Sequence, residues 1–169
     1  MAPRLIFPYV EGVVQPRSVD AVRTIAHELH LILREERLDP SDATHYARLL
    51  TELWAEPHDT ILIEHDVLVT SLMVARMMRC GEPFCVRRAW FGNSFGVGLA
   101  CVMFSGQLMA DEPDLMTDMH PSLQAASWHR LDTAILGELH IRGHDPHTHD
   151  EPVIHLHPYI RPDPQLDDC

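Results

Sequence analysis

The chain has 169 residues, of which 46% are hydrophobic, so it can bury an apolar core and is too apolar for a disordered protein. Its 25 acidic residues outnumber 13 basic ones, and the net charge of −12 disfavours broad binding to nucleic-acid phosphates. No apolar run approaches the roughly 18 residues of a membrane span, and nothing resembles a signal peptide. We therefore expect a cytoplasmic protein of one domain that makes no contact with membranes.

The N-terminal third of the chain predicts a strand followed by helices. Residues 4–10 form a short apolar run that is typical of a buried strand, and Glu11-Gly12 begins a loop. Ser18 is a good N-cap for a helix predicted over residues 19–37, in which apolar residues recur at helical spacing. A second helix is expected to end at Trp54.

Residues 60–69 predict a central strand, because the run is apolar and β-branched apart from Glu64-His65-Asp66. After it we expect, in order, a helix over 72–80, extended chain over 84–91, a strand over 96–105, an irregular acidic stretch over 111–120 and a helix over 123–142. Gly143 is expected to end the last helix, and a loop rich in His, Asp and Pro follows it.

This alternation of strands and helices predicts an α/β fold. We expect a single compact domain over residues 1–157, with a mostly parallel sheet flanked by helices. Residues 158–169 carry three prolines and predict a flexible C-terminal tail.

Glu64-His65-Asp66 is the first candidate for a binding site. Charged residues are rarely buried without partners, yet these three interrupt an apolar strand. In open α/β sheets, ligands bind beyond the carboxyl ends of strands, where a carboxylate can hold a divalent cation that bridges substrate phosphates. In the alternative interpretation the two acids cap the next helix or pair with an arginine.

A histidine-rich segment near the C-terminus is the second candidate. Six histidines fall within eighteen residues: His140, His144, His147, His149, His155 and His157. Imidazole is a common metal ligand, and the interleaved Asp145 and Asp150 could complete a site. Pairs two residues apart place both rings on one face of a strand. The alternative is a solvated loop, and the spacing does not decide which histidines would bind.

Other side chains give weaker signals. Trp128 is expected to face the core from a helix, and Asp132 one turn later could cap a loop or act as a general base. The segment 95–99 has two glycines but lacks the third of a dinucleotide fingerprint. Cys80 and Cys85 have a weak metal spacing, and we expect ordinary thiols because no second cysteine pair follows.

These segments together resemble a glycosyltransferase of the GT-A-like kind, and the likeness is closest to small phage-type or actinobacterial glycosyltransferase-like proteins. Residues 5–9 look like the first strand, which opens the nucleotide-sugar site in that fold. Residues 61–67 look like the acidic strand end that carries an Asp-any-Asp or Glu-Asp-Asp motif, with His65 in place of the middle acid. Residues 98–105 and 128–132 resemble the next strand and the later helix with its acid.

The resemblance implies metal-dependent transfer of a sugar from a nucleotide-sugar donor to an unknown acceptor. Mn²⁺ or Mg²⁺ would be held on the donor diphosphate. The likeness to phage-type proteins allows DNA as the acceptor, although the negative charge disfavours it. The residues carried over are Asp66, His155 and His157 as metal ligands, Glu64, Arg76 and Arg88 as donor-binding residues, and Asp132 as the catalytic base.

Two other functions stay open on the sequence. The C-terminal histidine cluster could hold zinc in a metal-dependent hydrolase, although no His-Glu-any-any-His motif is present. The chain is also short for a complete glycosyltransferase, which favours a non-catalytic glycosyltransferase-like module that binds a partner.

Overall fold

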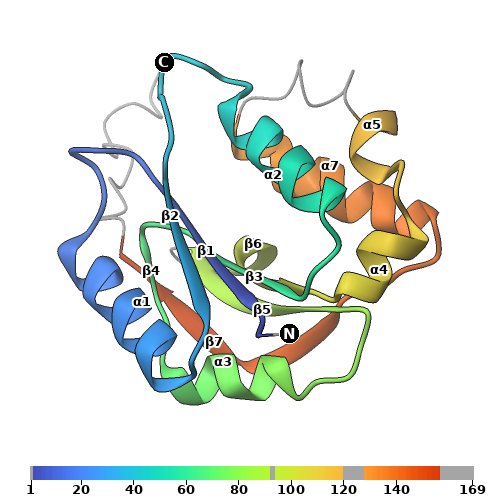
Figure 1. The fold of residues 1–169 in the computed structure, drawn as a ribbon. Coiled ribbons are helices and arrows are strands. Elements are labelled where there is room, and N and C mark those ends of the chain that lie inside the picture. Colours follow the sequence, from blue (N-terminus) through green and yellow to red (C-terminus); the bar gives the residue numbers. More distant parts are fainter. Residues whose placement is uncertain (1, 92–93, 120–127, 157–169) are drawn as a thin grey trace, which may run out of the picture.

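The computed structural model describes residues 2–91, 94–119 and 128–156 (Figure 1). The first half of the chain supplies β1 (Arg4–Tyr9), α1 (Pro16–Glu28), β2 (Ile32–Arg37), α2 (His45–Ala55), β3 (Thr60–Ile63) and β4 (Val67–Leu68). The second half supplies α3 (Ser71–Met78), β5 (Phe84–Phe91), β6 (Ser94–Phe104), α4 (Gly106–Asp111), α5 (Leu115–Asp118), α7 (Trp128–Ile141) and β7 (His147–His155). Within these described residues, no helix is both long and apolar enough to cross a membrane.

The seven strands form one mixed sheet in the order β2-β1-β3-β6-β5-β7-β4. The pairs β1-β2, β1-β3 and β5-β7 are parallel, whereas β3-β6, β5-β6 and β4-β7 are antiparallel. Only two residues separate β5 from β6, and so short a connection can join only antiparallel neighbours. The predicted α/β class is confirmed, and the sheet is mixed where mostly parallel pairing was expected.

Helices cover both faces of the sheet. Figure 1 shows α1 and α3 against one face, and α2, α4, α5 and α7 against the other. Side chains alternate between these layers along each strand, as the pleat requires. Ile6 and Leu62 belong to the core under α2 and α7, whereas Leu5 and Ile61 belong to the core under α1 and α3. All four are at most 1% exposed, so β1 and β3 are buried on both faces.

The sheet curls so that its far edge returns to its centre. Only residues 64–66 separate β3 from β4, yet β4 pairs with the end of β7 at the opposite edge of the sheet. In that pairing Val67 lies opposite His155 and Leu68 lies opposite Ile154. The C-terminal end of β7 therefore lies beside the carboxyl end of β3.

The helix predicted over residues 19–37 is wrong in its second half. Helix α1 ends at Glu28, and His30 has a φ of 53°, which a right-handed helix cannot contain. Residues 32–37 instead form β2, which pairs in parallel with β1 along its whole length. Pairing with a distant strand has overridden the helical propensity of this Leu-, Arg- and Glu-rich run.

Three other predictions also change in the structure. The strand predicted over 60–69 is two strands, because the chain turns at residues 64–66. The stretch 111–120 contains α5 and the end of α4, and the loop expected after Gly143 is largely β7. The helix over 72–80 and the strands over 84–91 and 96–105 are confirmed as α3, β5 and β6.

The helix predicted over 123–142 is described from Trp128 onward as α7, because residues 120–127 lie outside the described part. Gly143 follows α7 with a φ of 85°.

A buried arginine joins three of these elements. The Arg87 side chain on β5 is 0% exposed and donates hydrogen bonds to the carbonyl oxygens of Met73 on α3 (2.7 Å) and Glu151 on β7 (3.0 Å). The Glu151 carboxylate lies 3.6 Å from the same guanidinium and offsets its charge. Burial lowers the pKa of Arg87, which is the cost of placing a cation in the core.

Replacing this arginine should destabilise the protein. We expect Arg87→Ala to lower the free energy of unfolding by about 3 kcal/mol, because it opens a cavity and leaves buried acceptors without their donor. Arg88→Ala, at the exposed neighbouring position, is the matched control and should change it by less than about 0.5 kcal/mol. Denaturant unfolding followed by circular dichroism measures both, and equal effects would contradict this role of Arg87.

Candidate functional site

The strand order places a topological switch point between β1 and β3. The chain leaves β1 toward β2 on one side, and β3 lies on the other side of β1. Ligands of open α/β sheets bind at such a crevice, beyond the carboxyl ends of the strands. The loops that follow β1 and β3 meet there, because the Gln15 amide donates to the His65 carbonyl oxygen at 3.3 Å.

Glu64 lies at this point among other acids. It directly follows β3, and its amide donates to the Ala100 carbonyl oxygen of β6 at 3.1 Å. The Tyr46 hydroxyl of α2 donates to its carboxylate at 3.2 Å. Burial, with the charges of Asp132 and Asp66, raises the pKa of Glu64 to about 8, and the Tyr46 hydrogen bond only partly opposes this shift. Glu64 is therefore largely protonated at neutral pH.

Asp132 reaches the same cluster from α7. Its Oδ2 accepts a hydrogen bond from the Leu99 amide of β6 at 3.1 Å, which holds the carboxylate against the sheet. The approach depends on Gly98, because a Cβ atom at that position would lie only 2.4 Å from Asp132 Oδ2. A glycine in β6 thus makes room for an acid from a helix far along the chain.

Asp66 and His155 form the next part of the site. Asp66 is 6% exposed, and its Oδ2 lies 3.2 Å from Nε2 of His155. The backbone supports the contact, since the Leu156 amide donates to the Asp66 carbonyl oxygen at 2.6 Å. The curl of the sheet therefore brings together two of the three predicted metal ligands. The third, His157, lies outside the described residues.

The histidine-rich segment does not converge on one point. His140 contacts Asp145 at 2.7 Å, and His144 contacts Glu112 at 2.9 Å, both near the end of α7. His147 and His149 do share one face of β7, as their spacing predicts, and their ring centroids lie 4.9 Å apart. Among the described histidines, His155 is the one that the structure brings to Asp66.

The two predicted donor-binding arginines lie on different elements. Arg76 on α3 forms an ion pair with Glu151, and Arg88 is exposed on β5. Sequence reasoning missed Tyr46, because it occupies an apolar position of α2 and is only 4% exposed. The two glycines of segment 95–99 were noted in the sequence. One of them, Gly98, makes room for Asp132, which no local pattern could identify.

A helix end and a cavity also lie at the carboxyl edge of the sheet, near the end of β1. Helix α1 begins at Pro16 directly after the β1 loop, its N-cap Gln15 makes no side-chain cap, and its first turn carries no acid. A helix end of this kind favours an anionic group. A cavity of about 550 Å³ lies beside the ends of β1 and β2. Its lining residues are Glu11, Gly12, Arg37, Leu38, Asp39 and Pro40.

These features define a Rossmann-like α/β domain whose carboxyl edge gathers acidic side chains. No protein-family model and no curated protein matches the sequence. Among solved structures, the chain is similar to a glycosyltransferase involved in the glycosylation of the major capsid of PBCV-1. The TM-score is 0.58 and the identity 8%, over 92% of this chain and 93% of the other.

A second solved structure has a similar fold. It is a Bacillus anthracis protein assigned as a glucose-1-phosphate thymidylyltransferase, in complex with sucrose. Its TM-score is 0.57 and its identity 8%, over 88% of this chain and 87% of the other. The chain thus has the Rossmann-like fold of a glycosyltransferase, and the likeness concerns the fold alone.

Filling the space at Gly98 should disturb the acidic cluster. We expect Gly98→Ala to displace Asp132 from the Leu99 amide and to lower the free energy of unfolding by about 1–3 kcal/mol. Gly137→Ala on the exposed side of α7 is the control, because nothing lies within 4 Å of its added methyl group. It should stabilise the protein by about 0.5–1 kcal/mol. Denaturant unfolding compares the two, and a neutral Gly98→Ala would contradict the close approach.

The raised pKa of Glu64 predicts a pH-dependent stability. The unfolded chain releases this proton near pH 4.5 and the folded chain near pH 8, so the native state loses stability as the pH rises between these values. Glu64→Gln cannot titrate. Its stability relative to wild type should be lowest below pH 4.5 and should increase until about pH 8.

Urea unfolding at a series of pH values measures this difference. The exposed Glu82→Gln is the control, and its difference from wild type should not follow this pH window. A pH-independent difference for Glu64→Gln would show that Glu64 ionises normally in the folded protein.

Proposed function

We propose that the protein is a metal-dependent glycosyltransferase, which moves a sugar from a nucleotide-sugar donor to an acceptor. One observation supports this most directly. Glu64, Asp66 and Asp132 gather at the carboxyl edge of the sheet, next to the switch point, in a fold similar to that of a glycosyltransferase. Burial, together with repulsion from Asp132 and Asp66, raises the pKa of Glu64, and a bound divalent cation would offset the repulsion.

The donor set fits Mn²⁺ or Mg²⁺. Asp66 offers a carboxylate and His155 an imidazole nitrogen only 3.2 Å away, so both could face one ion. Carboxylates suit both metals and imidazole favours Mn²⁺, while the remaining positions would go to water or a diphosphate. When bound, the ion would offset the charge that develops on the leaving diphosphate. His157 remains a proposed additional ligand.

Other features of this edge would bind the donor. The first turn of α1 carries no acid and follows Gln15, whose amide contacts the turn after β3, so a diphosphate could lie beside this helix end. The cavity of about 550 Å³ beside β1 and β2 has room for a nucleoside. Arg88 is an exposed candidate for a phosphate contact, whereas Arg76 would first have to leave Glu151.

The acids would have different roles in the transfer. Asp132 is the proposed general base, since the Leu99 amide orients its carboxylate and it can accept a proton from an acceptor hydroxyl. Glu64 is protonated at neutral pH and could donate a hydrogen bond to a sugar hydroxyl or to a diphosphate oxygen. The acceptor is unknown, and the net charge of −12 disfavours DNA.

A thermal-shift experiment tests the proposal. A panel of nucleoside diphosphates, each with and without Mn²⁺, is added to the protein. We expect at least one of them to raise the Tm by roughly 5 °C in the presence of metal. Asp66→Asn should weaken the metal-dependent response at least about tenfold in nucleotide concentration, because a charged ligand is lost.

Glu82→Gln removes an exposed acid at the other edge of the sheet and should respond like wild type. A response that Asp66→Asn leaves intact would contradict the metal assignment. Binding without release of nucleoside diphosphate from any nucleotide sugar would instead favour a non-catalytic module. No stabilisation by any nucleotide would contradict the proposed donor class.

A further inference from the structure

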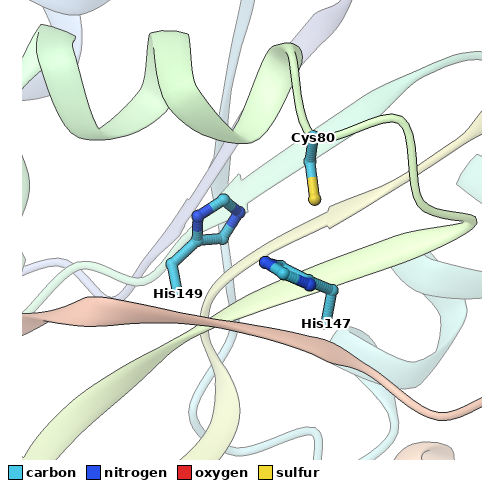
Figure 2. A group of neighbouring side chains, drawn as sticks. All are labelled: Cys80, His147 and His149. Carbon is cyan, nitrogen blue, oxygen red and sulfur yellow. The ribbon is translucent and has the colours of Figure 1, made fainter.

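We propose that Cys80, His147 and His149 form a binding site for Zn²⁺, separate from the acidic cluster. Figure 2 shows the Cys80 thiol and the two imidazole rings turned toward one another between the end of α3 and β7. One ligand atom of each residue lies within 4.8 Å of the others, which is the spacing of donors around a single ion.

A buried nitrogen points to a missing partner at this site. Nε2 of His149 is buried and has no hydrogen-bond partner among the described residues. A polar atom left in this way costs stability, unless something else binds to it.

The donor set selects the metal. A thiolate with two imidazoles favours Zn²⁺ and other thiophilic ions over Mn²⁺ or Mg²⁺, which prefer oxygen ligands. Cys80 and His147 are at least partly accessible, so an ion can enter. With three protein donors, the fourth position of a tetrahedral zinc site would be left to water.

The charges around the site can accommodate the ion. Arg87 acts on His149, and the charge of Arg87 is offset by Glu151. A Cys80 thiolate would add one negative charge, and Asp150 lies near enough to act on His149. The ion would tie the end of α3 to β7, a pair of elements that already share the contacts of Arg87.

This site is distinct from the one proposed for the nucleotide sugar. His149 lies beside Cys80 at the end of α3, whereas His155, six residues later on β7, contacts Asp66 after the end of β3. One strand would thus supply histidines to two sites with different donor atoms. The two proposals can fail independently, because they rest on different residues and on different metals.

Zinc titration of the reduced, metal-free protein tests the site. Wild type should bind one Zn²⁺ tightly at this site, and its Tm should rise by roughly 5–10 °C at free zinc about a hundred times the Kd. Cys80→Ser and His149→Ala should each weaken the affinity at least about a hundredfold. His140→Ala removes an exposed histidine of the same segment, outside the cluster, and should leave the affinity unchanged.

Substitution with Co²⁺ identifies the sulfur ligand directly. Wild type and Asp66→Asn should show a sulfur-to-cobalt charge-transfer band, and Cys80→Ser should lack it while still folding as judged by circular dichroism. A band that persists in Cys80→Ser would overturn the proposal. So would zinc affinity that is equal in wild type and His149→Ala, or a band that Asp66→Asn abolishes.

Discussion

The short turn between β3 and β4 is the constraint on which the site depends. Three residues, 64–66, carry the chain from the centre of the sheet to a strand that pairs with β7 at its far edge. The sheet must therefore curl, and the curl carries His155 to Asp66. The same turn ends β3 early, so the acids lie beyond the sheet instead of inside it. Local geometry at one turn thus determines which distant side chains meet.

This arrangement concentrates negative charge in a protein that is already acidic. Burial, together with repulsion from two other carboxylates, raises the pKa of Glu64 to about 8. At pH values above the normal pKa of a glutamate, such a cluster lowers the stability of the folded protein, so it does not serve folding. Perturbed acids at the ligand-binding edge of a sheet are instead typical of a functional site. A cation that binds only the folded chain would return the lost stability.

Sequence patterns predicted the elements whose burial is local. The α/β class, α3, β5, β6 and the glycine after α7 all follow from apolar runs and end signals. The patterns failed where pairing with a distant strand determines the secondary structure. The sequence of β2 predicts a helix, but its pairing with β1 makes it a strand. The acidic turn was recognised from its charges, whereas Tyr46 and Cys80 carry no such signal. Their roles depend on the residues that the fold places next to them, and these neighbours cannot be identified from a single sequence.

Formation of β7 determines which residues the histidines of the C-terminal segment contact. Read as a loop, its histidines could all serve one zinc ion, as a hydrolase would require. On β7, His147 and His149 lie beside Cys80, while His155 lies beside Asp66. The two ends of the strand therefore supply different sites, whose donor atoms suit different metals. Zinc bound to the purified protein would therefore be evidence about the link between α3 and β7, and manganese dependence would be evidence about the acidic turn.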